Sequence, residues 1–105
     1  MCVELFSLRD KVALVTGAGK GLGKSMALAL SESGAQVAVV SLTRSDLETT
    51  VHEIQENGGQ SIPVVADVTR QEEVGMMVEK VLKELKTIDI LVNNASAISL
   101  TTTEQ

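Results

Sequence analysis

The chain has 105 residues, of which 44% are hydrophobic and 1% aromatic, and a formal net charge of −5. Its length fits one domain at most, and the acidic balance without a Lys/Arg cluster argues against nucleic-acid binding. The lone Cys2 excludes an internal disulfide and a cysteine-based zinc cluster, and we expect no metal site. No apolar run has the length of a membrane span and the start lacks a signal-peptide pattern, so we expect a cytoplasmic location.

The first third of the chain predicts a strand, a turn and a helix. An apolar run over residues 12–16 predicts a buried strand, and four glycines follow within residues 17–23. A helical pattern then continues to Gly34, a residue typical of a helix end. Glycines let the backbone approach a diphosphate, and a helix start presents unpaired N–H groups to it. This segment therefore predicts a dinucleotide-binding turn.

The middle of the chain repeats the alternation of strand and helix. Residues 36–41 predict a second buried strand. Ser45 and Glu48 match a capping box, which predicts the start of a second helix that ends at the Asn-Gly-Gly of residues 57–59. Residues 61–66 predict a third strand, in which the proline at position 63 indicates an edge position.

A second capping-box pattern, Thr69 with Glu72, predicts the start of a third helix. Its expected apolar face comprises Val74, Met77, Val78, Val81, Leu82 and Leu85. Residues 88–93 predict a fourth strand. The alternation predicts an α/β fold, a Rossmann-type doubly wound parallel sheet of order 3-2-1-4, with the ligand site outside the carboxyl ends of its strands.

The predicted sheet stops at its fourth strand. That strand is largely apolar, and no later pattern covers its outer edge, which invites pairing with another chain. We therefore expect residues 1–105 to be the N-terminal part of a larger NAD(P)-binding Rossmann domain, truncated after the fourth strand.

The glycine spacing leaves two kinds of phosphate site open. Gly17 and Gly19 fit the first positions of G-x-G-x-x-G, but the third position falls on Leu22. Residues 23–25 match the Gly-Lys-Ser end of a P-loop, whose first glycine is replaced by Ala18. A P-loop therefore stays an alternative to a dinucleotide turn.

Three motifs in order resemble the short-chain dehydrogenase/reductase family. They are TGAGKGLG at residues 16–23, Asp67-Val68 after the third strand and Asn93-Asn94-Ala95 after the fourth. The match covers essentially the whole chain. It implies an oxidoreductase that uses NAD(P) on a carbonyl or secondary alcohol. The segment 6–18 also resembles bacterial members that act on 3-oxoacyl thioesters or sugar acids.

The resemblance assigns roles to residues of the glycine turn. It implies that Gly17, Gly21 and Gly23 hold the diphosphate, with Lys20 and Leu22 beside the phosphates and ribose.

It also assigns roles to the ends of the third and fourth strands. Asp67 would accept a hydrogen bond from the adenine amino group, while the Val68 backbone contacts the ring. Asn93 and Ala95 would line the ribose. Ser96 stands where the family usually has glycine.

The ribose side of the predicted site indicates which dinucleotide binds. An NAD site has an acid about 20 residues after the first glycine, yet residues 33–45 contain none. Leu42 stands where NADP-preferring members often carry arginine. The candidate ribose-side residues are Lys20, Ser41, Thr43 and Arg44. Their two cations favour the 2′-phosphate of NADP, with NAD as the alternative.

The sequence predicts no catalytic residue. Family members use an active-site tyrosine with a lysine and a serine for proton transfer, but this chain has no tyrosine. Its single histidine, His52, lies off the apolar stripe of the second predicted helix, which comprises Leu47, Val51 and Ile54. We expect the chain to bind cofactor without turnover. A small-molecule substrate and homo-oligomerisation would belong to a full-length form. The alternatives are a non-catalytic dinucleotide-binding or interaction module, and a methyltransferase-type fold, which usually needs an acid that is missing here.

Overall fold

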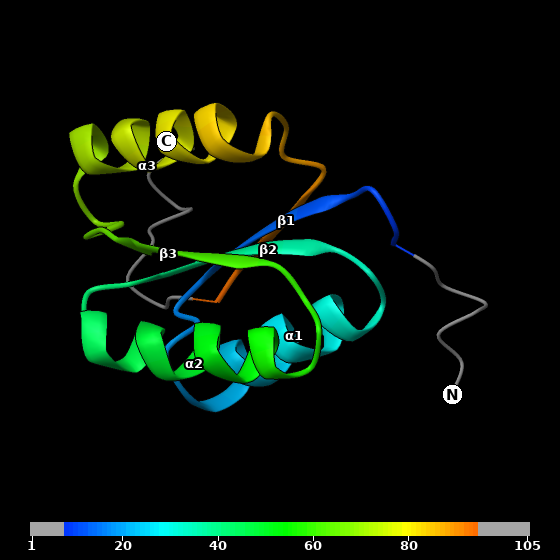
Figure 1. The fold of residues 1–105 in the computed structure, drawn as a ribbon. Helices are drawn as coiled ribbons and strands as arrows, with labels where there is room; N and C mark the ends of the chain where they lie inside the picture. The colour runs from blue at the N-terminus through cyan, green and yellow to red at the C-terminus, as the bar shows by residue number, and fades with distance from the viewer. Residues whose placement is uncertain (1–7, 95–105) are drawn as a thin grey trace.

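A computed structural model describes residues 8–94, which form four strands and three helices in alternation (Figure 1). The elements in chain order are β1 (Val12–Thr16), α1 (Gly21–Glu32), β2 (Gln36–Ser41), α2 (Arg44–Glu56), β3 (Ser61–Val65), α3 (Gln71–Leu85) and β4 (Ile90–Asn93).

The strands form one parallel sheet of order β3-β2-β1-β4, which confirms the predicted fold class and strand order. Thr16 at the end of β1 lies opposite Val40 of β2 and Asn93 of β4. Pro63 of β3 pairs with Val39 of β2, and β3 is an edge strand, as the proline predicted. The carboxyl ends of all four strands therefore meet at one edge of the molecule.

Helices cover both faces of the sheet, with α1 and α2 on one side and α3 on the other (Figure 1). Alternate residues of β1 divide between the two layers because successive strand side chains point to opposite faces. Val15 packs in the layer that contains Leu47 of α2, and Leu14 packs in the layer that contains Val81 of α3. Strands buried on both faces explain the continuous apolar runs in the sequence.

The two predicted capping boxes are wrong. The N-cap residues are Thr43 for α2 and Arg70 for α3, and neither makes a side-chain capping hydrogen bond. The Thr69 hydroxyl instead donates to Asp67 Oδ1 at 2.5 Å. Glu73, rather than the expected Glu72, accepts a hydrogen bond from the Asp67 backbone N–H. Asp67, which follows β3, also accepts the Thr69 backbone N–H at 3.0 Å, and this is the N–H that a capping box would pair with Glu72.

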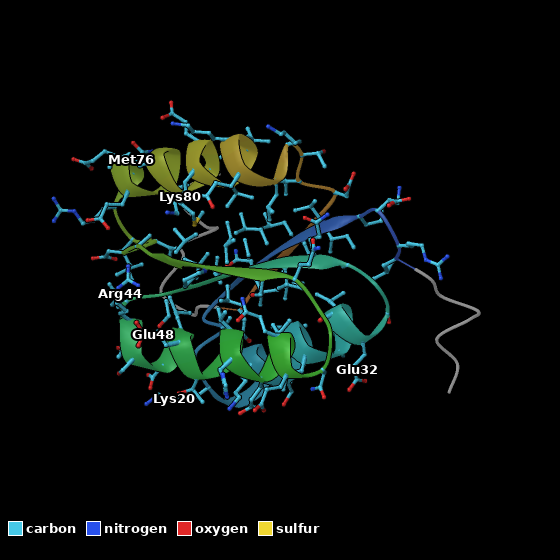
Figure 2. All side chains as sticks on the ribbon, viewed as in Figure 1. Lys20, Glu32, Arg44, Glu48, Met76 and Lys80 are labelled. Atoms are coloured by element: carbon cyan, nitrogen blue, oxygen red, sulfur yellow. The ribbon has the colours of Figure 1, made fainter. Side chains whose placement is uncertain are left out.

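The apolar face of α3 differs from the prediction at one residue, because Leu82 is 43% exposed. In α1, Leu22 is 68% exposed. Gly23 and Ala27 are the buried residues of α1, so this helix packs closely through small side chains. Met76 of α3 is exposed as well and is labelled in Figure 2.

The last strand begins at Ile90, two residues later than predicted. Asp89, just before it, accepts a hydrogen bond from the Val12 N–H through Oδ2 at 2.9 Å and donates its own N–H to the Val12 carbonyl at 2.8 Å. This reciprocal pair fixes the register of β4 against β1. No helix within residues 8–94 has the length and apolarity required to cross a membrane.

Candidate functional site

The turn between β1 and α1 depends on glycine at three positions. Gly17 and Gly21 have φ of +64°, a conformation that L side chains rarely adopt. A Cβ added to Gly23 would lie 2.0 Å from the Gly17 carbonyl oxygen, so only glycine lets the start of α1 approach the end of β1. A Cβ added to Gly21 would meet no atom within 4 Å. The turn is therefore tightly packed inside and open outside.

Hydrogen bonds join this turn to the end of β4. The Thr16 hydroxyl accepts from the Asn94 backbone N–H at 3.1 Å, and Asn94 Nδ2 donates to the Gly17 carbonyl at 3.4 Å. The polar residues after β4 thereby brace the turn from behind.

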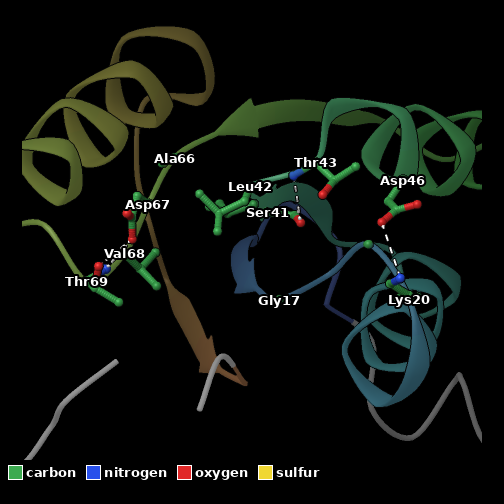
Figure 3. Close-up of a pocket in the computed structure, with 12 residues that line it drawn as sticks. Gly17, Lys20, Ser41, Leu42, Thr43, Asp46, Ala66, Asp67, Val68 and Thr69 are labelled. Atoms are coloured by element: carbon green, nitrogen blue, oxygen red, sulfur yellow. Dashed lines mark hydrogen bonds and ion pairs between the residues drawn. The ribbon is translucent and has the colours of Figure 1, made fainter. Parts of the chain in front are cut away.

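A cavity of about 340 Å³ opens at the carboxyl ends of β1, β2 and β3 (Figure 3). Its volume lies within the range of small-molecule sites, about 300–1,000 Å³. The turn, the end of β2 with the residues after it, the first turn of α2 and the segment after β3 line this cavity. The lining residues are Gly17, Gly19, Lys20, Val40, Ser41, Leu42, Thr43, Asp46, Ala66, Asp67, Val68 and Thr69.

The cavity brings together six of the residues predicted to bind the cofactor, which are Gly17, Lys20, Ser41, Thr43, Asp67 and Val68. Gly21, Leu22 and Gly23 lie beside it in the first turn of α1. Arg44 lies outside the lining and pairs with Glu48 at 3.7 Å; both are labelled in Figure 2. Ala95 lies outside the described residues.

Asn93 faces a different cavity. This second cavity, about 250 Å³, lies between the sheet and α3 and has a largely apolar wall that includes Leu14, Met77 and Leu91. The predicted ribose contact of Asn93 therefore has no counterpart in the lining of the first cavity.

Asp67 is held as an ionised hydrogen-bond acceptor. The Thr69 hydroxyl and the Thr69 backbone N–H, at 3.0 Å, both donate to its Oδ1. These bonds, together with the positive charge of Arg70, lower the pKa of the Asp67 carboxyl below its usual value. The carboxylate thus stays charged at neutral pH in the wall of the cavity.

Sequence reasoning missed Asp46. It lies in the first turn of α2, just past the acid-free segment 33–45, and its side chain lines the cavity beside Lys20. One turn later in α2, the buried Thr50 hydroxyl donates to the Ala18 carbonyl at 3.1 Å and so anchors α2 against the glycine turn. The helix-start position of Asp46 was visible in the sequence, but this packing was not.

The structure disfavours the P-loop alternative. In a P-loop the lysine reaches the phosphates. Here Lys24 Nζ contacts Glu53 Oε2 of α2 at 2.7 Å, and its side chain is 24% exposed. Lys24 is thus engaged away from the cavity. Within residues 8–94, no three His, Cys, Asp or Glu side chains converge as metal ligands.

Comparison with known proteins places these features in a family. A family model described as short chain dehydrogenase matches residues 11–105. The short-chain dehydrogenase/reductase homolog YusS from Bacillus subtilis (strain 168) is 46% identical over 88 residues, which cover 83% of this chain and 81% of YusS. Hydroxysteroid dehydrogenase-like protein 2 from Homo sapiens is 40% identical over 96 residues, but the chain spans only 23% of its length.

Solved structures share the same arrangement. Hydroxysteroid dehydrogenase from Escherichia coli superposes with a TM-score of 0.85 at 35% identity, covering 91% of this chain and 40% of that one. A 7α-hydroxysteroid dehydrogenase complexed with NADH and 7-oxo glycochenodeoxycholic acid superposes with a TM-score of 0.84 at 37% identity, covering 86% and 35%. The chain thus spans less than half the length of both.

Proposed function

Because the chain belongs to the short-chain dehydrogenase family, we propose that its cavity binds the adenosine diphosphate half of a nicotinamide dinucleotide. The observation that carries this proposal is the cavity itself, which opens where the glycine turn, the end of β2 and the end of β3 meet. Ligands of open α/β sheets bind in this crevice.

The start of α1 suits the diphosphate. Its N-cap, Lys20, makes no side-chain capping bond, and its first turn contains no acidic residue. The first turns of α2 and α3 do contain acids. Unpaired N–H groups and the positive end of the helix dipole therefore face the turn without a carboxylate from α1 itself. The open space beside Gly21 leaves room for the phosphates.

The other side of the cavity suits adenosine. Leu42 and Val68 offer apolar surface for a planar ring, and the ionised Asp67 offers an acceptor for the adenine amino group. The groups required by each part of the nucleotide are thus arranged along one cavity.

We further propose that NADP binds in preference to NAD. The residues that end β2 and follow it are Ser41, Leu42 and Thr43, so no carboxylate takes the usual position for the ribose 2′-hydroxyl. Lys20 lines the same wall and can attract a 2′-phosphate.

The reaction proposed for the complete protein is hydride transfer between the bound nicotinamide and a carbonyl or secondary alcohol, with 3-oxoacyl thioesters or sugar acids as the substrate class. This chain would bind and orient the cofactor. It contains no tyrosine, so it lacks the phenolic acid–base group of the family. We propose a cytoplasmic location for it.

The missing tyrosine also supports a second candidate, a non-catalytic dinucleotide-binding module. Assays of NADPH consumption distinguish these two candidate functions. They are run on the chain alone and, separately, on any longer form of the protein. NADPH consumption with a 3-oxoacyl thioester by the longer form only would favour the enzyme. Binding without consumption in both would favour the module.

Calorimetric titration of the chain with NADPH and NADH tests the binding proposal. We expect saturable binding of both, tighter for NADPH. Equal or reversed affinities would contradict the NADP preference. Absence of binding of either would overturn the proposed site.

A further inference from the structure

Asp46 is held over the glycine turn by its surroundings. A Cβ added to Gly19 would lie 2.7 Å from Asp46 Cβ, so the missing side chain at Gly19 makes room for the acid. The buried Thr50 hydroxyl donates to the Ala18 carbonyl and so fixes the position of α2 relative to the glycine turn. The packing of α2 against the glycine turn therefore determines the position of Asp46.

The Asp46 carboxylate meets the cation of the turn. Its Oδ2 lies 3.8 Å from Lys20 Nζ, and the pair spans the wall of the cavity (Figure 3). The Asp46 side chain is 32% exposed and that of Lys20 is 83% exposed. The acid is thus the more fixed partner, and Lys20 can move towards it or towards a ligand.

This wall separates the glycine turn from the end of β2, where the ribose 2′ substituent of a dinucleotide lies in sheets of this kind. Of the charged side chains in the described lining, Lys20 and Asp46 stand on this wall, and Asp67 stands on the segment after β3. A 2′-phosphate here would meet a lysine already paired with a carboxylate. A 2′-hydroxyl, being neutral, would be little affected.

We propose that Asp46 is a specificity-determining residue which engages Lys20 and so weakens the preference of this site for NADP over NAD. The inference rests on the proposed dinucleotide site. Asp46, in the first turn of α2, would thus influence the choice between NADP and NAD by reducing the attraction of Lys20 for a 2′-phosphate.

The substitution Asp46→Asn tests this proposal because it removes the charge and keeps the shape. We expect NADPH to bind about 3- to 10-fold more tightly to the variant, the size expected for one partly exposed charge at this distance. Binding of NADH should strengthen less, because NADH carries the shared diphosphate but no charged 2′ substituent, so the ratio of the two affinities should rise. Calorimetric titration at low salt measures both, and circular dichroism verifies that the variant is folded.

Glu56→Gln is the matched control. It removes the same unit of charge from the same helix, but Glu56 pairs with His52 at 3.0 Å and does not line the cavity. We expect no change in the ratio of the two affinities. A double-mutant cycle with Lys20→Gln adds a second readout: Lys20→Gln should weaken NADPH binding more in the Asp46→Asn background than in the wild type.

The outcomes separate this inference from the proposed function. If both dinucleotides bind and Asp46→Asn leaves the ratio unchanged, strengthens both equally or acts no differently from Glu56→Gln, the specificity role is overturned and the site stands. If the wild type and all variants bind neither dinucleotide, both proposals are overturned.

Discussion

Gly21 and Gly58 offer a matched pair of residues at opposite ends of the sheet. Both have positive φ, +64° and +88°, and a Cβ added to either meets nothing within 4 Å. Gly21 begins α1 beside the site, whereas Gly58 follows α2 near the amino ends of the strands. The same substitution at each therefore carries the same backbone strain in two different places.

We expect Gly21→Asp to abolish dinucleotide binding, because it places a carboxylate where the diphosphate is proposed to lie. Gly58→Asp should leave the affinity unchanged. Both should cost about 1 kcal/mol of unfolding free energy, the usual strain of a left-handed residue. Titration calorimetry and urea unfolding measure the two effects. Retained affinity in Gly21→Asp would move the diphosphate away from this turn.

Asp67 provides a prediction about pH at the residue scale. Thr69→Val removes the hydroxyl donor to Asp67 Oδ1, the largest cause of the lowered pKa, and should raise the pKa of Asp67 towards its usual value. NMR titration of the carboxyl carbon measures it. Thr49→Val is the control, because the Thr49 hydroxyl bonds only its own helix at Ser45 O. An unchanged pKa of Asp67 in Thr69→Val would show that the Thr69 hydroxyl does not lower this pKa.

The sign of the linkage follows from the direction of the shift. The folded-state pKa of Asp67 lies below the unfolded value, so its stabilising contribution is present above the unfolded pKa and is lost as the pH falls through the folded pKa. The carboxylate proposed to accept from adenine consequently stays charged throughout the neutral range.

At the scale of elements, the sequence predicted what local pattern decides. The buried runs of β1 and β2 gave the observed bounds, and Gly34 and Gly58 lie in positive φ just past the ends of α1 and α2. Both capping boxes were wrong: Ser45 lies inside α2, and the Thr69 backbone N–H, which a capping box would pair with Glu72, donates to Asp67 Oδ1 instead. The start of β4 depended on Asp89 reaching Val12, a contact across most of the chain.

The site shows the same division. The glycine turn and Asp67 were found from short motifs, and both belong to the lining. Asp46 was missed because its place depends on how α2 packs on the turn through Thr50. Arg44, adjacent in sequence to lining residues, pairs along its own helix with Glu48. Nearness in sequence to the end of a strand does not decide where a long side chain points.

Helix α3 contains a glycine that nothing requires. Gly75 is exposed in the helix interior, and a Cβ there would meet no atom within 4 Å. We expect Gly75→Ala to stabilise the chain by about 0.5–1 kcal/mol, because alanine lowers the backbone entropy of the unfolded chain. Urea unfolding measures the gain.

Gly23→Ala is the contrasting variant in α1. Its Cβ would lie 2.0 Å from the Gly17 carbonyl oxygen and 2.7 Å from Asn94 Nδ2, and backbone cannot easily give way. We expect a loss of about 1–3 kcal/mol or more, as for an overpacked core. Destabilisation by Gly75→Ala would contradict the open space around Gly75, and an unchanged stability in Gly23→Ala would contradict the close approach of Gly23 to Gly17.

The whole molecule has two unequal layers. Within residues 8–94, two helices cover one face of the sheet and α3 covers the other (Figure 1). Beside α3 lies the apolar cavity of about 250 Å³, and Leu91 of β4, which lines it, is 62% exposed. The proposed cofactor cavity shares Val68 with it and lies at the carboxyl ends of β1, β2 and β3. Ligand binding should therefore stabilise the sheet as one unit.

We expect NADPH to raise the unfolding midpoint of the chain. A ligand that binds only the folded state at 100 times its Kd adds about 2.7 kcal/mol, which in a domain of this size shifts the midpoint by on the order of 10 °C. Differential scanning calorimetry over a range of NADPH concentrations measures it. Gly58→Asp should start from a lower midpoint and show the same shift, whereas Gly21→Asp should show none. An equal shift in both variants would mean that the stabilising ligand occupies some other part of the molecule.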